Sequence, residues 1–180
     1  MRFEETGFSL IEAVIVLLVA AILLAVAIPA WSNAASAAHN MAARGALATS
    51  LLDAVRHSAL TGSEVVVCPA GSALQCSRQP DWSAGWIVFS DLNGNRVREP
   101  AETLVRQAAA LGGGVRLRST PGRTRLVFQP SGGNAGSNLT LTLCDSRGAD
   151  EATTLVVAND GRIRMGKPTA AAAQACVYGG

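Results

Sequence analysis

One apolar run near the N-terminus constrains this 180-residue chain more than any other feature. Between Phe8 and Ile28 the only charged residue is Glu12. A helix over those positions would be about 31 Å long at ~1.5 Å per residue, which matches the hydrocarbon thickness of a bilayer. The run therefore predicts a transmembrane helix over residues 8–29. A carboxylate inside such a helix costs about 3 kcal/mol, so Glu12 is expected to have a partner and a function.

A cleaved secretory signal peptide is the alternative interpretation, because alanine-rich triplets follow the apolar run. Such a peptide has basic residues ahead of a shorter apolar core. The residues ahead of this core include Arg2, Glu4 and Glu5, which are not basic on balance, and the core itself is long. The composition therefore favours a membrane helix, although spacing alone leaves cleavage after the alanines open.

The residues around Glu12 resemble a known processing signal. Gly7-Phe8-Ser9-Leu10-Ile11-Glu12 is similar to the class III signal of type IV pilins and type II secretion pseudopilins. The resemblance implies that prepilin peptidase removes residues 1–7 as a leader peptide, and that Phe8 becomes the N-methylated first residue. It also implies that Glu12 neutralises the new α-amino group of a neighbouring subunit when helices assemble.

Residues 30–61 are expected to continue the helix with a different pattern. Pro29 stands where pilins carry a helix-kinking proline, and it should bend the helix because proline removes one backbone hydrogen bond. Thr61-Gly62 is a plausible stop signal. Asp53 and His57, four residues apart, are expected to form a solvated pair on the polar side. The buried side is marked by residues at a spacing of 3.6, namely Leu47, Leu51, Ala54, Val55 and Ser58.

After Gly62 the hydrophobic period changes from 3.6 residues to two. The chain is therefore predicted to be α+β, with a long N-terminal helix and an antiparallel β-rich domain over residues 62–180. The tail from Lys167 onward is expected to be a free loop unless Cys176 is tethered. The runs that read as strands are residues 64–68, 85–89, 103–105, 115–118, 125–128, 139–143 and 154–157.

A second resemblance covers nearly the whole chain. Its motifs are Cys68-Pro69, Trp82-x-x-Gly85-Trp86-x-x-Phe89-x-Asp91-x-Asn93, Glu102-x-Leu104-x-Arg106, Phe128-x-x-x-Gly132 and Asp160-Gly161-Arg162. Together they resemble the GspH/FimT/FimU family of minor pilins and pseudopilins. The resemblance implies a pilin-like fold, a single pass through the inner membrane, and a periplasmic C-terminal domain that becomes surface-exposed in a pilus. The implied partners are other pilin or pseudopilin subunits, prepilin peptidase and the inner membrane.

Four cysteines follow the predicted membrane helix. In a periplasmic domain disulfides are the default expectation, and four cysteines allow three pairings. The favoured pairing joins Cys68 to Cys76 in a short loop and Cys144 to Cys176 at the tail. Zinc binding is the alternative, but there is no C-x-x-C pair and the histidines are remote in sequence.

Metal-binding and catalytic patterns are weak. Asp91, Asn93, Asn95 and Glu102 fall at positions 1, 3, 5 and 12 of a calcium-loop template, but its position 6 holds Arg96 where a glycine is needed. A polar turn between strands is therefore preferred, with no metal. The sequence has no G-x-S-x-G, H-E-x-x-H or phosphate-loop motif. We accordingly expect a protein that is not an enzyme and needs no cofactor.

Arginines are arranged in a pattern that indicates a basic surface. Only one of the fifteen basic residues is a lysine, and no acidic residue occurs over residues 103–143. Arg116 and Arg118 alternate with Val115 and Leu117, and Arg123 and Arg125 alternate with Thr124 and Leu126. The turn-forming residues 119–122 lie between the two runs. If the two strands form a hairpin, all four guanidinium groups face outward together. The alternative is a solvated strand face whose charge prevents aggregation.

A second basic cluster lies late in the chain, at Arg162, Arg164 and Lys167. In the FimT branch of the family, a Gly-Arg-x-Arg motif is associated with DNA binding during natural transformation, and Gly161-Arg162-Ile163-Arg164 resembles it residue for residue. The planar guanidinium fork is well matched to phosphate. Double-stranded DNA is therefore a candidate partner. The alternative is a type II secretion minor pseudopilin with no DNA-binding role.

Overall fold

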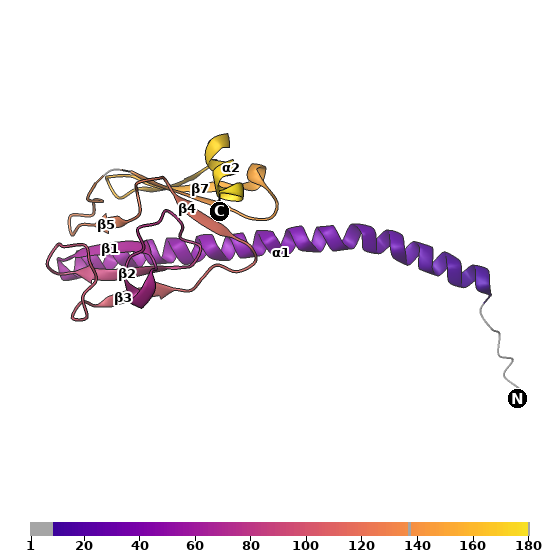
Figure 1. Cartoon of the computed structure of the whole chain (residues 1–180), viewed down its shortest axis with the longest axis horizontal. Helices are drawn as coiled ribbons and strands as arrows, with labels where there is room; N and C mark the ends of the chain where they lie inside the picture. The colour runs from indigo at the N-terminus through magenta and orange to yellow at the C-terminus, as the bar shows by residue number, and fades with distance from the viewer. Residues whose placement is uncertain (1–8, 137, 180) are drawn as a thin grey trace, which may run out of the picture. The chain divides into compact units, whose positions relative to one another are not determined.

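The computed structural model describes residues 9–136 and 138–179 (Figure 1). Gly7 and Phe8 lie outside the described residues. The chain divides into two compact units, Met1–Ala35 and Ser36–Gly180. Helix α1 (Leu10–Thr61), which is 52 residues long, contributes residues to both of them.

In the first unit, α1 carries apolar side chains on every side. The large ones from Leu10 to Ile28 are exposed, and the most apolar stretch of the helix has no buried residue. The helix continues through Pro29. Its length and composition are those of a helix that can cross a membrane once.

The second unit contains two antiparallel four-stranded sheets. The first has the order β3-β2-β1-β5 and the second β4-β6-β7-β8 (Figure 1). The first sheet consists of β1 (Glu64–Pro69), β2 (Trp86–Asp91), β3 (Leu104–Ala108) and β5 (Leu126–Phe128). The second consists of β4 (Arg116–Ser119), β6 (Leu139–Cys144), β7 (Thr153–Val157) and β8 (Ile163–Gly166). Short helices complete the unit: η1 (Ser72–Leu74), η2 (Ala149–Glu151) and α2 (Ala170–Tyr178).

One hydrophobic core joins both sheets to the second half of α1. The helix contributes Ala43, Leu47, Leu51 and Ala54, four positions at helical spacing that are almost fully buried. Each sheet supplies one face to the same cluster, because side chains alternate along a strand. The helix is therefore an interior element of the β-rich unit.

All seven strands predicted from the sequence are present, whereas strand β8, helix α2 and the short helices η1 and η2 were not predicted. Strand β8 was not predicted because Arg164 and Gly166 interrupt the apolar pattern of the segment. The tail after Lys167 is not a free loop, since α2 forms over residues 170–178 and Cys176 is tethered. The side chain of Thr169 accepts a hydrogen bond from the N–H of Ala172 at 3.3 Å and so caps the helix.

The predicted hairpin of the four arginines is wrong. Strand β4 pairs with β6, whereas β5 pairs with β1 in the other sheet. Leu117 on β4 and Leu126 and Phe128 on β5 are all buried in the shared core, which they enter from different sheets. The segment between these two strands is therefore a crossing between sheets.

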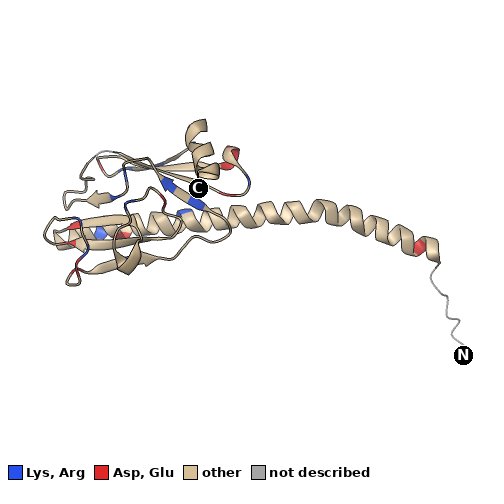
Figure 2. Cartoon of the chain, viewed as in Figure 1, with Lys and Arg blue, Asp and Glu red and all other residues tan. Residues whose placement is uncertain are grey.

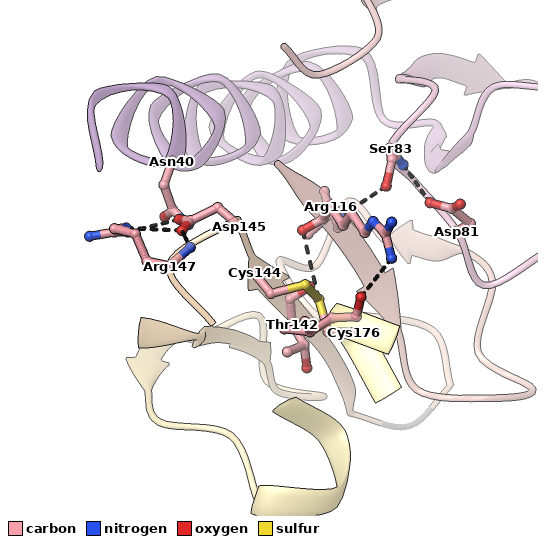
Figure 3. Close-up of a disulfide and its surroundings, with 11 residues drawn as sticks. Asn40, Asp81, Ser83, Arg116, Thr142, Cys144, Asp145, Arg147 and Cys176 are labelled. Carbon is pink, nitrogen blue, oxygen red and sulfur yellow. Dashed lines mark hydrogen bonds and ion pairs between the residues drawn. A yellow bond between two sulfur atoms is a disulfide. The ribbon is translucent and has the colours of Figure 1, made fainter. Parts of the chain in front are cut away.

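The two disulfides are Cys68–Cys76 and Cys144–Cys176, the pairs that the sequence favoured. The first closes a loop beside β1. The second joins β6 to α2 (Figure 3). No cysteine among the described residues is free.

Candidate functional site

Glu12 is the single charged residue in the described part of the first unit (Figure 2). It lies in the first turn of α1, where the helix dipole favours a negative charge. Its backbone N–H donates to Ser9, but its carboxylate is exposed and joins no ion pair among the described residues. An unpaired carboxylate on an apolar helix is available to a cation outside the chain.

A buried carboxylate ties the second half of α1 to the second sheet. The side-chain amide of Asn40 donates to Oδ2 of Asp145 at 2.7 Å, and the guanidinium of Arg147 binds both oxygens of the same carboxylate at 2.8 and 2.9 Å (Figure 3). Burial raises the pKa of Asp145, but hydrogen bonds from Arg147 and Asn40 and the charge of Arg147 outweigh it, so the pKa is held below its usual range.

Two further contacts attach α1 to the first sheet. The indole N–H of Trp86 donates to Ser50 Oγ at 2.9 Å in the core. Nearer the surface, Nε of Arg106 on β3 donates to Asp53 at 2.7 Å. The expected pair of Asp53 with His57 is therefore wrong, because the arginine of the neighbouring strand binds the carboxylate instead.

The loop that matched a calcium template is organised by its own backbone. Asp91 accepts hydrogen bonds from the N–H groups of Gly94 and Arg96, at 2.9 and 2.8 Å. Glu102 accepts from Leu92 and Glu99, at 2.9 and 3.0 Å. These carboxylates are used to hold a polar turn, and no group of metal-ligating side chains occurs among the described residues.

The Gly161-Arg162-Ile163-Arg164 motif forms the turn into β8, the edge strand of the second sheet. Gly161 has φ +79°, and a Cβ there would lie 2.2 Å from the carbonyl oxygen of Gly132, so the turn requires glycine. Arg162 and Arg164 are both exposed. The backbone of Arg164 pairs with Val156 on β7.

Asp160 compensates part of the charge of this motif. Arg162 forms an ion pair with Asp160 and also donates its backbone N–H to the same carboxylate at 3.1 Å. That backbone hydrogen bond, the Arg162 guanidinium and the charge of Arg164 hold the pKa of Asp160 below its usual range. This partner stands two residues before Arg162 and was not predicted from the sequence.

The sheet register places Arg116, Arg118 and Arg164 on one face, because they share it with Cys144, Thr142 and Val156 respectively. The four strands put β4 and β8 about 14 Å apart at ~4.8 Å per strand. Helix α2 lies against β6 and β4 on this face.

The side chains of Arg116 and Arg118 lie against the C-terminal end of α2. Nη1 of Arg116 donates to the carbonyl oxygen of Val177 at 2.7 Å (Figure 3), and Arg118 lies against Gly179. A cation at this end of a helix is stabilising because the last carbonyls have no partner within the helix.

The remaining predicted basic residues lie elsewhere. Lys167 follows β8, and its ammonium group donates to the carbonyl oxygen of Asp150 at 2.7 Å. Arg123 and Arg125 lie in the crossing between sheets, where Nη1 of Arg125 donates to the carbonyl oxygen of Arg96 at 3.2 Å. The structure thus distributes the seven predicted DNA-binding residues over three places: the end of α2, the crossing between sheets, and the β8 edge.

A long apolar helix that enters the core of an antiparallel β-rich unit defines a pilin-like protein. Residues 43–161 match the family described as type II transport protein GspH, so the chain belongs to the GspH family. It is a minor pilin or pseudopilin, a structural class. No curated protein matches the sequence.

Three solved structures share the fold. Two crystal structures of the type IV minor pilin FimU of Pseudomonas aeruginosa are 15% identical, with TM-scores of 0.54 and 0.55. Each alignment covers 73% of this chain. It covers 94% of the FimU chain in the first structure and 89% in the second. The minor pseudopilin EpsH from the type 2 secretion system of Vibrio cholerae is 14% identical, with a TM-score of 0.51, over 72% of this chain and 98% of that chain.

Proposed function

We propose that this protein is a minor pilin that assembles into or caps a type IV pilus. Prepilin peptidase removes residues 1–7, and the mature chain begins at N-methylated Phe8. Residues 8–29 cross the inner membrane once, and residues 62–180 form the periplasmic part. The observation that carries the proposal is an exposed apolar helix whose one carboxylate, Glu12, joins no ion pair within the described residues 9–136 and 138–179. Two disulfides fit an oxidising compartment.

The processing step has a direct test. Mass spectrometry of the protein extracted from membranes should show loss of residues 1–7 and the gain of one methyl group on the new amine. A mature chain that begins near Ala34 or Ala38 would instead identify a conventional signal peptide and contradict the proposal.

We further propose that Arg162 and Arg164, with Lys167, bind the phosphates of double-stranded DNA for natural transformation. The supporting observation is their exposure on the edge strand β8, which holds Arg164, and directly beside it, where Arg162 and Lys167 lie. Arg116 and Arg118 share the face but are used at the end of α2, so their contribution is smaller.

The test is DNA binding by the full chain in neutral detergent, followed by fluorescence anisotropy over a range of salt concentrations. The double variant R162Q/R164Q should bind more weakly, and the slope of log affinity against log salt should flatten by roughly 2, because each phosphate contact contributes about 0.9. Thermal stability should barely change, since both side chains are exposed. If the slope of log affinity against log salt is the same in wild type and variant, these arginines do not contact DNA phosphates.

A matched variant tests the partner of Arg162. In Asp160→Asn the Oδ1 acceptor for the Arg162 N–H remains while the negative charge is lost. DNA affinity should rise about two- to fivefold, because an exposed carboxylate no longer competes with phosphate. Unchanged affinity would mean that Arg162 does not face the DNA.

A type II secretion pseudopilin is the second candidate, favoured by the fold shared with EpsH. The two functions predict different phenotypes. Deletion of a pilus subunit should reduce DNA uptake and leave protein secretion intact, whereas deletion of a pseudopilin should do the reverse. The neighbouring genes, either pilus genes or secretion genes, are the simplest observation that would discriminate between the two functions.

A further inference from the structure

A hollow of about 330 Å³ lies where the crossing between β4 and β5 meets the loop after β2. Three arginines line it: Arg96 from that loop, and Arg123 and Arg125 from the crossing. The lining contains no carboxylate, and the sequence over residues 103–143 contains no acidic residue at all. The hollow therefore has an excess of positive charge.

No ion pair among the described residues balances the charge of these arginines. The ion pairs among the described residues involve Arg106, Arg147 and Arg162, and none of them includes an arginine of the hollow. Arg125 donates to a neutral backbone carbonyl. By contrast, Arg162 of the predicted DNA motif already has the carboxylate of Asp160.

The backbone beneath the hollow is held in place. Arg96 has φ +60°, and its N–H is fixed by the buried carboxylate of Asp91 at 2.8 Å. Arg123 closes a turn by donating its N–H to the carbonyl of Thr120 at 3.0 Å. Arg125 directly precedes β5, which is paired with β1. Fixed backbone reduces the ordering cost when a ligand binds.

We propose that this hollow binds a phosphate group. Guanidinium groups bind phosphate oxygens through paired, charge-assisted hydrogen bonds, and three arginines line this hollow without an ion pair among the described residues. The volume lies at the lower end of small-molecule sites, which fits a phosphate with part of what it is attached to. The phosphate comes either from the free anion or from the backbone of duplex DNA.

A glycine-rich loop connects the hollow to the predicted DNA motif. Asn134, Ala135 and Gly136 line the hollow. The N–H of Asn134 donates to the carbonyl of Asn159 at 2.8 Å, and Gly132 packs against Gly161. The DNA source of the phosphate rests on the function proposed above, whereas the site for a free phosphate stands without it.

The experiment uses the full chain in neutral detergent, titrated separately with inorganic phosphate and with a short DNA duplex. Phosphate is followed by nuclear magnetic resonance of the arginine side chains, and DNA by anisotropy. R123Q/R125Q is compared with R56Q/R78Q, which removes two exposed arginines that join no ion pair among the described residues. At least one probe should bind about tenfold more weakly to R123Q/R125Q than to wild type, because charged hydrogen bonds are lost. The affinity of R56Q/R78Q for the same probe should stay within about twofold of wild type.

The two arms identify the source of the phosphate. A loss confined to inorganic phosphate identifies the free anion, and a loss of DNA affinity identifies the DNA backbone. If neither probe is weakened more by R123Q/R125Q than by R56Q/R78Q, the hollow is not a phosphate site. R162Q/R164Q, measured in parallel, reports on the DNA motif alone, so failure of that proposal is recognised separately.

Discussion

Asp145 shows how one buried side chain can determine the attachment of a long helix. Its side chain is fully buried, and it accepts hydrogen bonds from Asn40, 105 residues earlier in the chain, and from Arg147. Removal of a partner from a buried, charged network is costly because it leaves a polar group without its hydrogen bonds.

The pKa of Asp145 gives this contact a pH dependence. An unfolded aspartate has a pKa of about 3.9. Since the folded pKa is lower, the stability that Asp145 contributes is complete above the unfolded value and is lost as the pH falls through the folded value. We therefore expect the free energy of unfolding to be insensitive to this group near neutral pH and to decrease below about pH 4.

Asp145→Asn tests the assignment by denaturant unfolding as a function of pH. The variant should lose about 2–4 kcal/mol at neutral pH and show a smaller further loss in acid. Asp150→Asn, at an exposed site nearby, serves as the control and should match wild type. An acid-induced loss of equal size in Asp145→Asn and wild type would assign the pH dependence to other carboxylates.

At the residue scale, sequence reasoning succeeded where a local pattern was enough. The Cys68–Cys76 pair could be predicted from a short spacing. The contact of Asn40 with Asp145 could not, because no periodicity connects residues so far apart. The predicted arginine hairpin was wrong for a related reason. Alternation predicts which side of a strand a residue occupies, but not which strand will be its neighbour.

At the scale of elements, α2 is the main addition to what the sequence indicated. Its residues are mostly alanine, the best helix former, and Thr169 is a good N-cap, so a signal for the helix was present. The helix was nevertheless not predicted, because the segment is of low sequence complexity. The helix buries few side chains, mainly Ala173 and Cys176, which makes the disulfide its principal attachment.

Loss of Cys144–Cys176 should therefore destabilise the second unit. We expect C144A/C176A to lose roughly 2–5 kcal/mol of unfolding free energy, since the crosslink restricts the unfolded chain. Denaturant unfolding without reductant measures it. Arg116→Gln keeps the disulfide and removes only the hydrogen bond to Val177, so it should lose about 1 kcal/mol. A double cysteine variant as stable as wild type would show that α2 is held by packing alone.

At the scale of the whole molecule, the first unit is apolar and exposed over its described residues 9–35, and Glu12 is the one charged residue among them. Glu12→Ala should leave membrane insertion intact or improve it, because a costly charge is gone. Incorporation into filaments should fall if the carboxylate neutralises a neighbour's amine. Immunoblotting of membranes and of sheared filaments separates the two effects.

Two controls sharpen this result. Glu12→Gln keeps the size of the side chain and should fail like alanine if charge is what matters. Glu5→Gln changes a residue of the proposed leader peptide, which is removed before assembly, so it should behave as wild type. Normal incorporation of Glu12→Ala would show that assembly does not use this charge.

The overall architecture was largely predictable, and its division into sheets was not. A period of 3.6 followed by a period of two determines a helix followed by strands. Strand order depends on which apolar faces meet in the core. Leu117 and Leu126 look equivalent in sequence, yet they reach the core from different sheets.

The sharing of one core by α1 and both sheets has a mechanical consequence. A filament subunit experiences pulling forces, and a globular part joined by a flexible linker would swivel under such a load. Here Leu47 and Leu51 of the helix are interdigitated with side chains of both sheets, without a linker. Tension on the β-rich unit is therefore transmitted through a packed interior, in which displacement of the helix would lose close-packed contacts. Sliding of the helix would also break its hydrogen bonds to Asp145 and Trp86.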